Sequence, residues 1–267
     1  MKSINILIPT YNRAEALAVT LTSLCFQAEK DFDIVISDQS HENTLQQDIT
    51  LQAVLRLLQS KGHRVTILKN LPAKGMAHQR QFLLEQARAP YVLFIDDDLI
   101  LEPYVVHNLK KTIQQQQCGF VGAAVIGLSY KQDIRPHQQE IEFWNGKVQP
   151  ETVHPNSPHW QRYLIHNAAN ILHLEEKYQA SPQHPVKYKV AWVGGCVMYD
   201  SEKLKQAGAF GFWKELPMHH CGEDVLAQLR VMKISGGCGI IPSGVYHQEL
   251  ATTVTDRKVN APEVLDV

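Results

Sequence analysis

Tyr91-Val92-Leu93-Phe94-Ile95-Asp96-Asp97-Asp98 joins an apolar run of strand length directly to three carboxylates. A short apolar run bounded by polar residues is typical of a strand that is buried on both faces. Three adjacent carboxylates repel one another, and this repulsion is costly at a partly buried strand end. A divalent cation relieves it, and ligands that are all oxygen atoms favour a hard ion such as Mg²⁺ or Mn²⁺. We therefore predict a metal-binding edge at Asp96, Asp97 and Asp98, with a solvated acidic turn as the alternative.

Upstream of this segment, strand-like and helix-like patterns alternate along the chain. The predicted strands cover residues 4–8, 32–37, 64–68 and 91–95, and the predicted helices cover residues 14–27, 45–60, 76–87 and 103–117. This alternation predicts an α/β fold in which a mostly parallel sheet carries helices on both faces. Ligands bind at the carboxyl ends of the strands in such sheets, so functional residues are expected directly after Ile8, Ser37, Leu68 and Ile95.

The second half of the chain has a different character. Prolines interrupt residues 129–188 repeatedly, and we predict an irregular insertion there with one helix near residues 160–178. Regular patterns return with a predicted strand at 189–199, helices at 201–207 and 223–235, and strands near Gly239 and Val245. We therefore predict one domain over residues 1–267, in which residues 1–128 and a mixed half at 189–267 flank the insertion.

The composition is that of an ordinary globular protein and disfavours several functional classes. The chain has 267 residues and a formal net charge of −1, so it lacks the basic surface typical of nucleic-acid binding. Its apolar runs fall far below the roughly 20 residues that a membrane-spanning helix requires. The first strand begins too early to leave room for a signal peptide, and the five cysteines form no C-x-x-C pair. We expect a soluble, cytoplasmic protein without a transmembrane segment, and leave peripheral membrane association open.

Polar residues follow the first two predicted strands, where a ligand is expected to bind. Pro9, Thr10, Tyr11 and Arg13 lie in the turn after the first strand, although Thr10 also suits a helix cap. Asp38 follows the second strand and has the chemistry to accept hydrogen bonds from a ribose or a base, with a simple turn aspartate as the alternative. The absence of a Gly-x-Gly-x-x-Gly turn and of a P-loop motif disfavours dinucleotide-binding dehydrogenases and P-loop enzymes.

Two further candidates lie late in the chain. Glu223 and Asp224 open a predicted helix, where the helix dipole stabilises carboxylates, so helix capping is one interpretation. The other interpretation is a general base that takes a proton from an attacking hydroxyl. His247 follows a late predicted strand, where a neutral imidazole has the chemistry to complete an aspartate-based metal site.

Taken in order, these motifs resemble those of the family 2 glycosyltransferases, which have the GT-A fold. The matching segments are the turn Pro9-Thr10-Tyr11-Asn12-Arg13, the acidic segment Ser37-Asp38-Gln39-Ser40, the stretch from Gly75 to Arg80, the D-x-D-like Asp96-Asp97-Asp98, the acceptor-side stretch from Trp192 to Met198, and the pair Glu223-Asp224. Two positions depart from the family pattern, because Ser37 replaces the first acid of the usual Asp-Asp-Gly-Ser and Gln81 replaces the usual Asn after Arg80.

The resemblance implies a GT-A-type, Rossmann-like sheet and an inverting transfer of a sugar from a nucleotide-sugar donor, typically a UDP-sugar, to a hydroxyl of a saccharide or other acceptor. It implies that Asp98 and Asp96 hold Mn²⁺ or Mg²⁺, with His247 as a candidate third ligand, and that Asp224 is the general base with Glu223 in support. The implied donor contacts are Pro9, Thr10, Tyr11, Arg13, Asp38, Lys74, Gly75, Arg80, Asp96 and Asp97, and the implied acceptor contacts are Trp192, Gly194 and Gly195.

Two rival classes follow from the same observations. A sugar nucleotidyltransferase has a related sheet but opens with a glycine-rich loop after the first strand, whereas residues 9–13 contain no glycine. A non-catalytic nucleotide-sugar-binding homologue is disfavoured because the chain keeps both acidic motifs, at residues 96–98 and at residues 223–224. Turnover with a panel of nucleotide sugars separates an enzyme from a binding protein.

Overall fold

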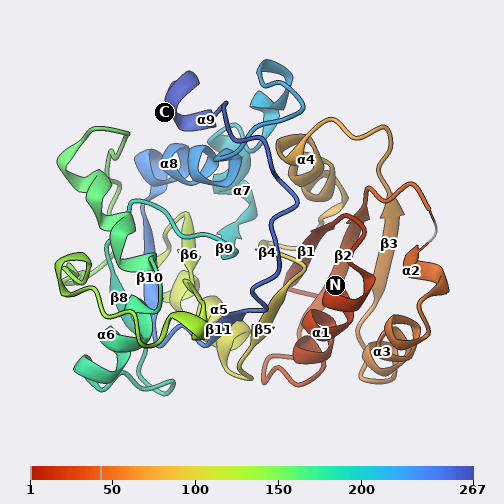
Figure 1. The fold of residues 1–267 in the computed structure, drawn as a ribbon. Coiled ribbons are helices and arrows are strands. Elements are labelled where there is room, and N and C mark those ends of the chain that lie inside the picture. Colours follow the sequence, from red (N-terminus) through yellow and green to blue (C-terminus); the bar gives the residue numbers. More distant parts are fainter. Residues whose placement is uncertain (1, 43) are drawn as a thin grey trace.

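One large sheet passes through the molecule, with helices packed on both of its faces (Figure 1). The computed structural model describes residues 2–42 and 44–267. Within these residues, the sheet has eight strands in the spatial order β3 (Val65–Lys69), β2 (Phe32–Asp38), β1 (Ile4–Thr10), β4 (Tyr91–Ile95), β9 (Cys196–Asp200), β6 (Phe120–Gly122), β10 (Gly237–Ile241) and β8 (Val186–Tyr188). All of them except β9 and β8 run in the same direction. The predicted α/β fold with a mostly parallel sheet is confirmed.

The central strands are apolar along their whole length because both faces of the sheet are buried. In β1, Ile4, Ile6 and Ile8 pack into the core on one face and Leu7 into the core on the other, as the two-residue period of a strand requires. The first core is covered by α1 (Ala14–Cys25), α3 (Ile49–Ser60) and α5 (Val105–Gln116), and the second by α4 (Met76–Gln86), α7 (Ser201–Gln206) and α8 (Glu223–Ser235).

A small second sheet fixes the end of β4. Its strands are, in spatial order, β5 (Leu99–Leu101), β11 (Val245–His247) and β7 (Val125–Ile126). His247 pairs with Leu99 in the antiparallel ladder, and the Gln248 amide donates to the Asp98 carbonyl at 2.8 Å. The late strand predicted near Val245 therefore exists, and it brings His247 directly to Asp98.

The predicted insertion consists mostly of short helical turns and loops. Its elements are η1 (Leu128–Tyr130), η2 (Pro136–Gln138), η3 (Pro158–His166), α6 (Asn170–Tyr178) and β8. The single helix predicted near residues 160–178 is wrong, because Ala168 adopts a left-handed φ of 49° and separates the 3₁₀ helix η3 from α6. The remaining short helices of the described chain are α2 (Thr44–Gln47), η4 (Gly211–Glu215) and α9 (Ala261–Val264).

Two more predicted elements differ from the structure. The helix predicted at residues 45–60 is divided at Asp48, whose side chain accepts from the Leu51 amide and caps α3. The strand predicted at residues 189–199 begins only at Cys196. Before it, the backbone of Val193 is held by a side chain, since Gln228 both donates to the Val193 carbonyl and accepts from its amide at 2.8 Å. These two bonds take the place of the hydrogen bonds that a neighbouring strand would make, so the apolar segment before Cys196 stays irregular.

Across residues 2–42 and 44–267, no helix combines the length and apolar character needed to cross a membrane. The division of the chain at residues 128 and 188 stays a prediction, and strands from both halves contribute to the large sheet.

Candidate active site

A cleft of about 600 Å³ opens at the carboxyl ends of β1 and β4. Its lining brings together residues from the beginning, middle and end of the sequence, as expected where parallel strands end. Of the residues predicted to be functional, those that line the cleft are Pro9, Thr10, Tyr11, Arg13, Arg80, Asp96, Asp97, Asp98, Trp192, Gly194, Gly195, Glu223, Asp224 and His247.

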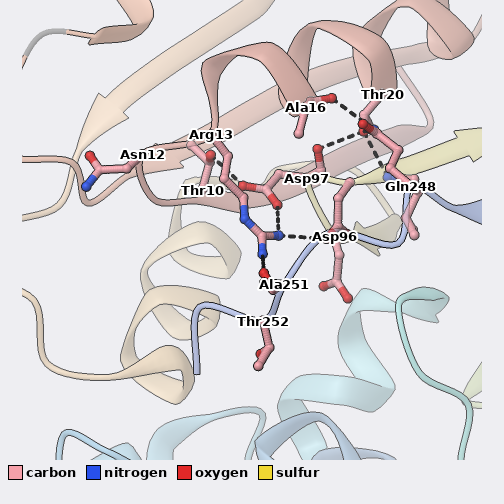
Figure 2. A network of polar contacts seen from close by, with 12 residues as sticks. Thr10, Asn12, Arg13, Ala16, Thr20, Asp96, Asp97, Gln248, Ala251 and Thr252 are labelled. Carbon is pink, nitrogen blue, oxygen red and sulfur yellow. Dashed lines mark hydrogen bonds and ion pairs between the residues drawn. The ribbon is translucent and has the colours of Figure 1, made fainter. Parts of the chain in front are cut away.

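Asp97 connects the end of β4 to the turn after β1 (Figure 2). Its carboxylate accepts a hydrogen bond of 2.6 Å from the Thr10 hydroxyl and one of 3.2 Å from Arg13, while the Thr20 hydroxyl donates to its carbonyl at 2.8 Å. Burial raises the pKa of Asp97 to about 6, and the hydrogen bond from Thr10 and the charge of Arg13 oppose this increase. In this arrangement Asp97 orders the polypeptide around the site.

Asp98 and His247 form a second contact at the cleft floor. His247 Nε2 lies 3.4 Å from Asp98 Oδ2, and the same carboxylate oxygen accepts a hydrogen bond of 2.6 Å from Arg13. His247 Nδ1 accepts from the Glu249 amide at 2.7 Å, which implies that the neutral ring carries its proton on Nε2. The Asp98 carboxylate is therefore contacted by both the His247 ring and the Arg13 guanidinium.

The described residues contain no group of three or more His, Cys, Asp or Glu side chains arranged to hold a metal ion. Asp98 and His247 do converge, and Mg²⁺ is commonly held by one or two carboxylates together with substrate phosphates. The donor set thus fits a metal that the substrate helps to bind.

Arg80 connects the two acidic motifs of the cleft, residues 96–98 and residues 223–224. Arg80 Nε donates to Glu223 Oε1 at 3.0 Å, and its Nη2 donates to Asp96 Oδ1 at 3.3 Å. The Arg80 and Glu223 side chains are both more than nine-tenths buried, whereas the Asp96 side chain is 40% exposed. The carboxylates of Glu223 and Asp96 raise the pKa of Arg80 and keep it charged despite burial.

Asp224 is the neighbouring acid at the start of α8, and it makes fewer contacts than Glu223. Among the described residues, the hydrogen bond recorded for its carboxylate comes from the amide of Val225, at 2.9 Å. Burial raises the pKa of Asp224 to about 7, the Glu223 carboxylate adds to the increase, and Arg80 opposes it. A carboxylate with a pKa near neutrality, placed at a cleft, has the properties of a general base.

The wall near Trp192 is aromatic. The rings of Tyr163 and Trp192 stack with their centroids 6.1 Å apart and an interplanar angle of 10°. The ring centroid of Trp160 lies 6.0 Å from that of Tyr163. Gly195 has a φ of 79°, and a Cβ on it would lie 2.5 Å from Val125 Cγ2. Its carbonyl accepts from the Asp96 amide at 3.0 Å, so this glycine lets the aromatic segment approach the aspartates.

Three predicted donor contacts lie outside the cleft lining. Asp38 is buried and ion-paired with Lys69 at 2.7 Å. Lys74 Nζ lies 5.5 Å from the ring centroid of Trp213. Gly75 precedes α4 with a φ of 96°, packed so closely on His220 that a Cβ would lie 2.5 Å from that ring.

Several residues that line the cleft carry no functional signal in the sequence. Trp160 comes from η3, at the start of the single helix that the pattern predicts near residues 160–178. His220 accepts from the Ala77 amide and holds the start of α4. Arg257 belongs to the segment between β11 and α9, where no periodic pattern marks a function.

Comparisons with known proteins identify the family of the chain. A model described as glycosyl transferase family 2 matches residues 5–176, which is more than half of the chain. The chain is 30% identical over 98 residues to the Escherichia coli UDP-Glc:alpha-D-GlcNAc-diphosphoundecaprenol beta-1,3-glucosyltransferase WfaP, a match that covers 37% of this chain and 36% of the relative. The match spans only about a third of the length of the curated relatives. It covers 35% of one of them and 36% of another.

Solved structures share the fold at low sequence identity. TarS 1–349 of S. aureus in complex with UDP-GlcNAc has a TM-score of 0.55 and 17% identity, over 95% of this chain and 60% of TarS. The mannosyltransferase PcManGT from Pyrobaculum calidifontis, in complex with GDP-Man and Mn²⁺, has a TM-score of 0.58 and 14% identity, over 95% of this chain and 59% of that one. These likenesses show the GT-A-type fold, and the match of the family model shows that the chain belongs to glycosyl transferase family 2.

Proposed function

We propose that this protein transfers a sugar from a nucleotide-sugar donor to an acceptor hydroxyl by a single, inverting displacement. The observation that carries the proposal is the meeting of the two acidic motifs in one cleft, where Arg80 contacts both Asp96 and Glu223. One motif lies where a donor diphosphate is expected, at the carboxyl end of β4. The other presents Asp224 with a pKa near neutrality.

In the proposed reaction, the acceptor oxygen attacks the anomeric carbon while the bond from that carbon to the diphosphate breaks. The acceptor proton passes to Asp224, and the nucleoside diphosphate leaves with the electron pair of the broken bond. General-base catalysis of this kind contributes typically about 10²–10⁴-fold to the rate. Glu223 is bound to Arg80 and is therefore assigned the supporting role of fixing the first turn of α8.

A divalent cation, Mn²⁺ or Mg²⁺, is part of the proposal. Asp98 and His247 would hold it, and when bound it would neutralise charge on the leaving diphosphate as a Lewis acid. Arg13 bonds to both Asp97 and Asp98 and offsets part of their negative charge. The Mn²⁺ in the complex of the related mannosyltransferase supports the use of a divalent cation.

The donor and acceptor classes follow from the site and from the relatives. UDP-sugars are the proposed donors, in keeping with the UDP-GlcNAc complex of TarS and the UDP-Glc in the name of WfaP. Tyr11 is 42% exposed at the cleft and offers a ring on which a base can stack. For the acceptor, the stacked Trp192 provides an aromatic wall for the C–H face of a saccharide. A lipid-linked acceptor, as in the name of WfaP, would bring the protein to a membrane surface.

The deciding experiment is a thermal-shift screen of nucleoside diphosphates with and without Mn²⁺, followed by turnover with the matching nucleotide sugars. We expect UDP to raise the melting temperature more with Mn²⁺ than without it, because a ligand that binds only the folded state stabilises that state. Donor hydrolysis or transfer should follow. Binding without any turnover would support the non-catalytic alternative instead, and no binding of any nucleotide would refute the proposal.

A further inference from the structure

The charged groups that line the cleft are unevenly paired. Five carboxylates and three guanidinium groups line it. Arg13 is paired with Asp97 and Asp98, and Arg80 is paired with Asp96 and Glu223. Arg257 is the remaining guanidinium, and among the described residues its recorded side-chain contacts are with neutral oxygens alone.

Arg257 lies on a segment that crosses the cleft, residues 250–260, which we call the C-terminal strap. Figure 1 shows this blue segment running between β11 and α9. At its first end, Arg13 donates to the Ala251 carbonyl, beside Asp97 (Figure 2). At its other end, Cys221 and Val259 share a backbone hydrogen bond of 2.9 Å, just before α8. The strap is therefore attached to both walls of the cleft.

Contacts within the strap orient the Arg257 side chain. Its Nε donates to the Val254 carbonyl at 3.3 Å and its Nη2 donates to the Thr252 hydroxyl at 3.2 Å. These bonds hold the guanidinium on the strap and leave the Nη1 donors for another group. A guanidinium presents a planar set of donors that matches phosphate oxygens, and hydrogen bonds between the two charged groups are strong.

We propose that Arg257 binds the diphosphate of the nucleotide donor, an inference that rests on the proposed function. A diphosphate entering the cleft meets the carboxylates at residues 96–98 and at residues 223–224, which repel it. Arg13 and Arg80 are already paired with these carboxylates, so among the three guanidinium groups of the cleft Arg257 is the one whose charge remains for the ligand. It stabilises the bound diphosphate and also the charge that develops there as the sugar is transferred.

The test compares a diphosphate with its nucleoside in binding experiments that need no turnover. Isothermal titration measures UDP, uridine, GDP and guanosine, each with Mn²⁺ and with EDTA, on the parent protein and on Arg257→Gln, Arg257→Lys and Lys258→Gln. Lys258 is the matched control, because it is an exposed cation next to Arg257 that does not line the cleft. Thermal unfolding without ligand checks that each variant keeps its fold.

We expect Arg257→Gln to weaken binding of the preferred diphosphate by roughly 10- to 100-fold, as expected for the loss of a charged hydrogen bond, and to leave nucleoside binding unchanged. Arg257→Lys should recover part of the loss, and Lys258→Gln should bind like the parent. Unchanged diphosphate affinity in Arg257→Gln, an equal loss for the nucleoside, or an equal loss in Lys258→Gln would each overturn the inference while leaving the proposed function intact. A parent protein that binds no nucleotide at all would overturn both.

Discussion

Arg80 Nε donates to Glu223 Oε1 across 3.0 Å and so links α4 to the first turn of α8, two helices far apart in the sequence. Both side chains are more than nine-tenths buried, so neither charge is well solvated without the other. The pair fixes the helix start from which Asp224 projects. It therefore connects the stability of the fold to the geometry of the site.

Replacing Arg80 with Met should lower the free energy of unfolding by about 3–5 kcal/mol, because it leaves the buried Glu223 carboxylate without its partner. Urea unfolding followed by circular dichroism measures the change. Arg56→Met is the control, since Arg56 is exposed on α3 and its loss should cost no more than about 0.5 kcal/mol. Equal stabilities for the two variants would show that the Arg80 pair is not a structural link.

Metal affinity should depend on Asp98 and His247. Asp98→Asn should abolish metal-dependent UDP binding with the fold intact, because the amide does not supply the negative charge. His247→Ala should weaken Mn²⁺ affinity by roughly 10- to 100-fold if the imidazole is a ligand. Titration of Mn²⁺ in the presence of UDP measures both, with His219→Ala as an exposed control. An unaltered titration in His247→Ala would mean that the residue only supports Asp98.

The transfer rate should rise with pH up to about 7 and level off above it. A general base must be deprotonated to accept a proton, and the pKa of Asp224 is raised to about 7 by burial and by Glu223, against the effect of Arg80. Below this pH the rate should fall about tenfold per unit, in proportion to the ionised fraction. A pH profile of kcat measures this, and a rate that is flat from pH 5 to 8 would exclude an ionisation near 7 from the chemical step.

The sheet was predictable because its signal is local. Each apolar run, such as those of β1 and β4, and each helical spacing between them is a property of a few neighbouring residues. The runs are easy to recognise because both faces of these strands are buried, so nearly every residue is apolar. The errors lie where a distant partner decides the structure. Gln228 holds the backbone of Val193, for example, and no pattern within residues 189–195 could reveal this.

The same distinction applies to the site. Asp96 and Glu223 could be selected from the sequence because each follows or begins a recognisable element. That Arg80 is shared between them depends on how α4 packs against α8, which the sequence alone does not show. Arg257 could not be selected for a related reason. Its segment has no periodic pattern, so nothing in the sequence indicates that it lines the cleft.

The two acids that open α8 should differ sharply in function. Successive side chains in a helix point about 100° apart, so only one of the pair can face the acceptor squarely. Glu223 is bound to Arg80, whereas Asp224 borders the cleft with a hydrogen bond to its own helix turn. Asp224→Asn keeps the shape of the side chain but removes the proton acceptor.

Asp224→Asn should therefore bind donor nucleotide like the parent and lose about 10²-fold or more in kcat. Glu223→Gln is the matched variant, and it should lose less activity because its amide can still accept a hydrogen bond from Arg80. Steady-state transfer and nucleotide titration on both proteins separate the two roles. If Asp224→Asn transfers sugar at nearly the parent rate, or loses nucleotide affinity in proportion to its rate, then Asp224 is not the base. In that case the pair acts on the start of the helix, and the proton acceptor must be sought among the other groups of the cleft.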